Sequence, residues 1–212
     1  MKTQDAATAG TVCVFPCINL GGVGRTLEAV LLEAVEKATS AYPQLGQVCE
    51  RLSNYKPLLL DYIKGRELVA WLDFELAELD DADEPLLNTS FPICSGDRYL
   101  FGEDLMFVEA EELAKAAESA GASGFRDAQV GPGQFEVVRH VGVGDNTRIE
   151  LHCKRQVLES FTVPRRAYVE AIRKALERVW ATRLALLKAI ADLPAKYYAL
   201  VDGVERAFDR VA

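Results

Sequence analysis

The C-terminal quarter of the chain carries the pattern that most restricts its fold. Across 169–190, apolar side chains recur every three or four residues, which is the spacing of one face of an α-helix. Thr162 is a favourable residue for the start of this helix, and Pro194 interrupts the pattern. A second apolar stripe follows, made of Tyr197, Val201, Val204, Phe208 and Val211. Two amphipathic helices joined by a short break predict an antiparallel helical hairpin over 162–212.

The second helix of this hairpin must bury its apolar stripe. The apolar face of the preceding helix is the nearest complement along the chain, so we expect the two helices to pack against each other. A homodimer through the C-terminal helices is the alternative, because long amphipathic helices often pair with a second copy.

The segment 135–154 has the alternation of a β-hairpin. Apolar and polar residues alternate on both sides of the turn-forming sequence Gly144-Asp145-Asn146. We pair Val143 with Thr147, because this register opposes His140 to Glu150, a favourable cross-strand pair.

That register decides which residues of the hairpin share a face. The apolar face consists of Phe135, Val137, Val141, Ile149, Leu151 and Cys153. The polar face consists of Glu136, His140, Arg148, Glu150, His152 and Lys154. Both histidines of the chain therefore lie on the solvated face, and Arg139 is the one residue that breaks the pattern.

Shorter patterns fill the rest of the chain. They predict strands at 11–18, 67–76, 99–101 and 105–108, helices at 26–42, 44–52 and 109–120, and a loop at 121–133. The run 56–63 fits a strand and a helical turn equally. We therefore predict one α+β domain over 1–212, with a small mixed or antiparallel sheet and packed helices. Within it, 1–10 is a flexible tail and 11–155 is the sheet-and-helix body.

A glycine-rich turn lies between the first predicted strand and the first predicted helix. The sequence Leu20-Gly21-Gly22-Val23-Gly24-Arg25-Thr26 resembles the phosphate loop of the partition and cell-division ATPases of the P-loop class. The resemblance implies nucleotide binding by Gly21, Gly22, Gly24, Arg25 and Thr26. Arginine stands where that family has its phosphate-binding lysine, and the opening lysine corresponds to Leu20. The simpler interpretation is a tight turn, in which Arg25 binds no phosphate.

Charge is distributed unevenly along the chain. The net charge is −8. From Asp73 to Glu118 there are 14 acidic and two basic residues, whereas from Lys154 to Lys188 there are nine basic and three acidic residues. The acidic total argues against nucleic-acid binding, and no apolar run is long enough for a membrane span. We expect a cytoplasmic protein, because 1–10 lacks the apolar core of a secretory signal.

The reactive residue types form no complete catalytic or metal-binding motif. The five cysteines are scattered and odd in number, as expected of reduced thiols. The acidic loop 78–84 lacks the spacing of a calcium-binding loop. We therefore expect no cofactor and no metal, and we favour a protein without enzymatic activity.

These observations favour a non-catalytic module that binds a basic partner protein. The predicted contact residues are Trp71, Asp73, Glu75, Glu78, Asp80, Asp81, Asp83 and Glu84. In composition the chain is similar to toxin-neutralising immunity proteins, which are small, acidic and without catalytic residues. The alternatives are a degenerate P-loop-like nucleotide-binding protein and an enzyme whose site is assembled from dispersed residues.

Overall fold

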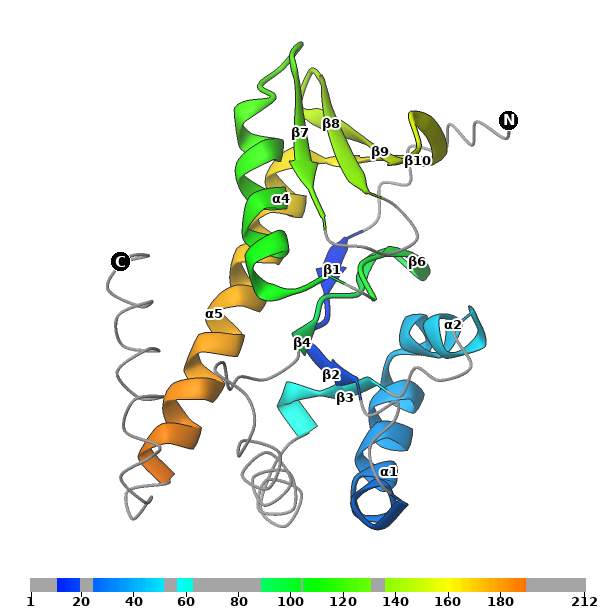
Figure 1. The fold of residues 1–212 in the computed structure, drawn as a ribbon, viewed down its shortest axis with the longest axis vertical. Helices are drawn as coiled ribbons and strands as arrows, with labels where there is room; N and C mark the ends of the chain where they lie inside the picture. Colours follow the sequence, from blue (N-terminus) through cyan, green and yellow to red (C-terminus); the bar gives the residue numbers. More distant parts are fainter. Residues whose placement is uncertain are drawn as a thin grey trace.

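The fold combines four helices with three antiparallel sheets in the residues that the computed structural model describes, namely 11–19, 25–51, 57–62, 89–103, 105–130 and 136–189 (Figure 1). The predicted α+β class is confirmed. The predicted strand at 67–76 and the second helix of the C-terminal hairpin lie outside the described residues.

A proline divides the first predicted strand between two sheets. Strand β1 (Val12–Val14) pairs with β5 (Ile93–Ser95), which pairs with β6 (Arg98–Phe101). Pro16 has no N–H to donate, so the pairing stops there. After it, β2 (Cys17–Asn19) forms the centre of a second sheet between β3 (Pro57–Leu59) and β4 (Thr89–Ser90). Within the ambiguous run 56–63, the described residues form strand β3 and then the 3-10 helix η1 (Leu60–Tyr62).

Two helices follow the predicted patterns near the N-terminus. Helix α1 (Arg25–Ala41) packs on β3 through Leu31, Ala34 and Val35, and α2 (Pro43–Arg51) begins at the proline that ends it. Leu45 and Val48 of α2 are fully buried against β6 and its neighbours.

The largest sheet has the order β10-β9-β8-β7 and is covered on one face by two helices (Figure 1). Its strands are β7 (Phe125–Gln129), β8 (Val137–Val143), β9 (Asn146–Cys153) and β10 (Gln156–Pro164). The covering helices are α4 (Phe107–Ser119) and α5 (Arg165–Ala189). Val138, Ile149, Leu151 and Phe161 point into this core, where they meet Leu113, Tyr168 and Ile172.

The predicted register of the central hairpin is wrong by one residue. Val143 pairs with Asn146, His140 with Ile149, and Arg139 with Glu150. The cause is the turn, which contains two residues instead of three. Gly144 takes the first position with φ +58°, where a glycine at positive φ suits the tight turns of hairpins.

The shift exchanges the buried and outer faces of β8 relative to the prediction. Val138, His140 and Gly142 are buried, whereas Val137 and Val141 lie on the outer face. Gly142 lies against the loop after α4, where a side chain would collide with the carbonyl oxygen of Gly121. The apolar face predicted for β9 is correct, so only one strand of the hairpin was placed wrongly.

Three further predictions are corrected. The segment 121–133 is not all loop, because β7 occupies part of it. The predicted strand at 105–108 is instead the approach to α4 and its first turn. Thr162 lies in β10, and the long helix begins at Arg165. Strand β10 escaped detection because its first four residues are all exposed, which removes the alternation that marks a strand.

The turn between β9 and β10 holds two non-glycine residues at positive φ. Lys154 has φ 48° and Arg155 has φ 67°, values that favour Asn-Gly in two-residue hairpin turns. We expect the double change Lys154→Asn and Arg155→Gly to raise the free energy of unfolding by about 1–2 kcal/mol. Urea denaturation measures this. The matched control, Lys154→Arg with Arg155→Lys, should change nothing, and an equal response of both variants would disprove the strain.

Candidate functional site

The outer face of the four-stranded sheet is the candidate site. Because the strands pair in register, side chains on this face form three rows across the sheet. The central row consists of Asp127, Arg139, Glu150 and Ser160. One flanking row consists of Phe125, Val141, Arg148 and Thr162. The other consists of Gln129, Val137, His152 and Val157.

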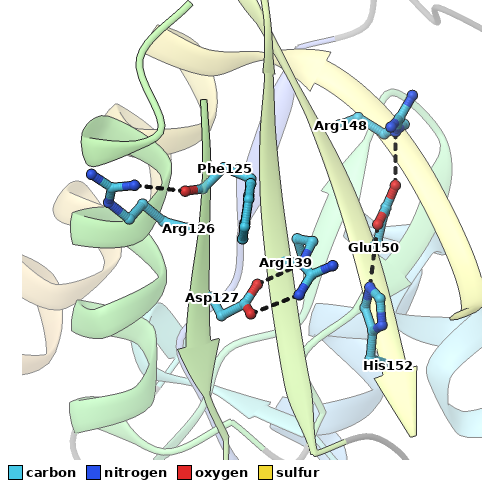
Figure 2. Close-up of polar contacts among 7 residues, drawn as sticks. All are labelled: Phe125, Arg126, Asp127, Arg139, Arg148, Glu150 and His152. Carbon is cyan, nitrogen blue, oxygen red and sulfur yellow. Dashed lines mark hydrogen bonds and ion pairs between the residues drawn. The ribbon is translucent and has the colours of Figure 1, made fainter. Parts of the chain in front are cut away.

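Arg139 is fixed at the middle of the face by two neighbours (Figure 2). Its Nε donates to Oδ1 of Asp127 at 2.7 Å, and its Nη2 donates to Oδ2 at 2.9 Å. The guanidinium carbon lies 4.8 Å from the centre of the Phe125 ring. The hydrogen bonds from Arg139 lower the pKa of Asp127, and the same bonds raise the pKa of Arg139. The pair therefore stays ionised and holds the guanidinium over an aromatic ring.

Glu150 connects Arg148 and His152 beside this pair (Figure 2). Its Oε1 accepts from Nε of Arg148 at 2.9 Å, and its Oε2 lies 3.2 Å from Nε2 of His152. The side chains of Glu150 and His152 are only 16% and 14% exposed. Among the described residues, the side chain of His152 is hydrogen-bonded to this carboxylate and to no hydroxyl or thiol. The arrangement orients the imidazole of His152 through a carboxylate.

His140 lies on the opposite side of the sheet, so the prediction of two solvated histidines is wrong for this one. It is fully buried, and its Nε2 lies 3.2 Å from the hydroxyl of Tyr168. Burial lowers the pKa of His140 to about 4. This histidine is therefore a neutral core residue and not part of the outer surface.

Large apolar side chains remain exposed at the margins of the outer face. Phe125 is 55% exposed on β7, and Val143 is 47% exposed at the end of β8. Val157 and Leu158 on β10 are 48% and 51% exposed, next to an irregularity in the β9–β10 pairing. A fixed arginine and aromatic ring with exposed aliphatic neighbours is the composition found at protein interfaces.

The residues predicted as a site from the sequence lie mostly outside the described part of the chain. This holds for Trp71, Asp73, Glu75, Glu78, Asp80, Asp81, Asp83 and Glu84, and for Gly21, Gly22 and Gly24. Arg25 and Thr26 are the first two residues of α1, and β2 ends at Asn19, so a strand precedes the glycine-rich segment and a helix follows it. The described strands pair only antiparallel with one another.

Three basic residues of α5 are paired with acidic residues of the same chain. Arg173 pairs with Glu118 of α4 at 2.8 Å, Lys174 pairs with Glu170 at 2.8 Å, and Arg178 pairs with Asp61 of η1. The pairs contribute little stability because they are exposed. They show, however, that the basic segment meets partners within the fold.

Comparison with known proteins does not identify a family, because no family model, curated protein or solved structure matches this chain. In the described ranges, no three His, Cys, Asp or Glu side chains are grouped to hold a metal ion. No helix in the same ranges is both long enough and apolar enough to cross a membrane.

Proposed function

We propose that this protein is a non-catalytic binding module that engages a basic partner protein, in the manner of an immunity protein. The outer face of the four-stranded sheet supports this proposal. Asp127 and Arg139 hold each other in place over Phe125, so the face presents a rigid aromatic and arginine surface at little cost in side-chain entropy.

The proposed basic charge of the partner rests on which charges of this chain are paired within the fold and which are not. Three basic side chains of α5 are paired with acidic residues of the fold. The chain as a whole keeps a net charge of −8, concentrated in the acidic stretch that includes Asp80, Asp81 and Asp83. Such an excess attracts a basic protein and speeds its association.

The test captures proteins from a native lysate at low and high salt on the immobilised chain and on variants. We expect a basic protein to be retained at low salt and released at high salt, because exposed charges are screened. Phe125→Ser combined with Val157→Ser should weaken its binding by about tenfold or more, since both side chains are exposed on the outer face and apolar anchors dominate interfaces. The control is Met106→Ser with Val108→Ser, which removes two exposed apolar side chains outside the sheet face.

A second pair of variants tests the charge argument with the same captured protein. Changing Asp80, Asp81 and Asp83 to asparagine should weaken binding and flatten its salt dependence. Changing Glu36, Glu50 and Glu177 to glutamine removes as much charge from exposed positions on the helices and should have a smaller effect. Equal binding by all four variants, or retention of an acidic protein only, would contradict the proposal.

A further inference from the structure

Four of the five cysteines come together in one small hydrophobic cluster. Cys13 on β1, Cys17 on β2, Cys49 on α2 and Cys94 on β5 all pack in the cluster around Leu45, Val48 and Tyr99. Scattered spacing in the sequence gave no sign of this, because the four residues arrive from two sheets and a helix. Two of these four cysteines lie on directly paired strands.

Cys13 and Cys94 are direct partners across the antiparallel strands β1 and β5. The backbone hydrogen bonds from Phe15 N to Pro92 O, at 2.9 Å, and from Gly96 N to Thr11 O, at 3.0 Å, lie two residues to either side. Hydrogen-bonded pairs alternate along such a ladder, so Cys13 and Cys94 also form one, with Cα atoms about 5.5 Å apart. This separation is within the roughly 4.4–6.8 Å that a disulfide bridges.

The two side chains also point the same way. Both lie on the face of this sheet that meets α2, whereas the neighbouring Val12 and Ile93 point into the main core. Cβ atoms of a hydrogen-bonded pair are somewhat farther apart than a disulfide prefers. Bond formation therefore requires β1 to shift relative to β5, and β1 can do so because it is three residues long and lies at the edge of its sheet.

The two thiols differ in exposure, and this difference determines which of them reacts first with an oxidant. Cys13 is half-buried, and Cys94 is fully buried. Burial raises the pKa of Cys94 to about 12, so this thiol is protonated at neutral pH and the first reaction falls on Cys13. Cys17 is also fully buried, and it lies on β2 in a different sheet with no such strand pairing to Cys94.

We propose that Cys13 and Cys94 are a thiol pair that oxidises to an intramolecular disulfide, with a low-molecular-weight disulfide such as oxidised glutathione as the oxidant. The Cys13 thiolate attacks one sulfur of the oxidant, forms a mixed disulfide and releases one glutathione thiolate. Cys94 then attacks the Cys13 sulfur, and its proton goes to the departing second thiolate. The two protein thiols lose two electrons and two protons in total, and the oxidant is reduced to two thiols.

The bond would tie together two distant parts of the sequence. The closed loop runs from residue 13 to residue 94 and contains α1, α2, β3 and the acidic stretch. Closing so long a loop restricts the unfolded chain strongly, so oxidation should raise the melting temperature by on the order of 10 °C. The gain should disappear on reduction with dithiothreitol.

The test exposes the reduced full-length chain to oxidised glutathione, and intact mass spectrometry and peptide mapping follow the products. We expect a final species lighter by two hydrogens, with the peptides of Cys13 and Cys94 linked. Cys94→Ala should stop the reaction at the glutathione adduct on Cys13, and Cys13→Ser should prevent both products. Cys49→Ser and Cys153→Ser are matched controls that should still form the bond. A wild-type chain that stays as the adduct, links other cysteines or gains no thermal stability would overturn the proposal.

Discussion

Replacing Gly102 by alanine is expected to lower the free energy of unfolding by about 2–5 kcal/mol. Two penalties combine at this position. Gly102 has φ +110°, a conformation that costs other residues about 1–2 kcal/mol. An added Cβ would also lie 2.2 Å from the carbonyl oxygen of Phe91 and 3.3 Å from a methyl group of Leu105. The backbone must move to relieve such a contact, and overpacking of this kind costs about 1–3 kcal/mol more.

Two other glycines separate these penalties. Gly144 has φ +58° but open space around its Cβ position, so Gly144→Ala should cost only the conformational part. Gly46 lies inside α2 with nothing near its Cβ position, so Gly46→Ala should stabilise the protein by about 0.5–1 kcal/mol. Urea denaturation of the three variants should place Gly102→Ala lowest and Gly46→Ala highest. If Gly102→Ala proved no worse than Gly144→Ala, the tight contact with Phe91 would be disproved.

Acidification should destabilise the protein through His140, by roughly 3 kcal/mol. The pKa of this residue is about 4 in the fold, against an ordinary value of 6.5. Between these pH values, His140 binds a proton in the unfolded chain but not in the folded chain. The free energy of unfolding therefore falls as the pH drops through this window. The loss is complete below about pH 4. The cause is burial of the ring beside Tyr168, whereas the nearby charge of Asp127 acts weakly in the opposite direction.

The measurement is the free energy of unfolding by urea at a series of pH values. His140→Leu should remove most of the dependence between pH 6.5 and 4, although it also removes the contact with the Tyr168 hydroxyl and lowers stability at neutral pH. His152→Gln, on the outer face, is the matched control and should leave the His140 contribution intact. If the free energy of unfolding of His140→Leu depends on pH as strongly as that of the wild type, another group is responsible.

Helices were predictable where local signals agreed with the tertiary environment. The helix expected at 109–120 matches α4 closely, because a first-turn acid and a glycine just after its end mark both limits. Gly121 adopts φ +59° there, as a residue after a helix end often does. Pro43 likewise marks the boundary between α1 and α2.

The candidate surface could not be predicted, because it depends on register. Three of the four valines of β8, Val137, Val141 and Val143, lie on its outer face, so hydrophobicity favoured the wrong face as the buried one. Arg139 was the one signal: it broke the assumed pattern, and it lies at the centre of the outer face between Asp127 and Glu150. The polar face of β9, with Arg148, Glu150 and His152, was predicted correctly. The other members of the surface belong to β7 and β10, which carry no strand-like alternation over most of their length.

The passage of the chain through Pro16 joins the two small sheets into a single cooperative unit. On one side of this proline, the N–H of Phe15 donates to the carbonyl of Pro92, and on the other, the carbonyl of Pro16 accepts from the N–H of Leu60. The same few residues also place Phe15 and Cys17 in one hydrophobic cluster and Val12 and Ile18 in the other. Both small sheets contribute residues to both clusters, so opening either cluster disturbs strands of both sheets. Amide protons of β1 and β2 should therefore exchange with solvent together, at the rate of the slower of the two.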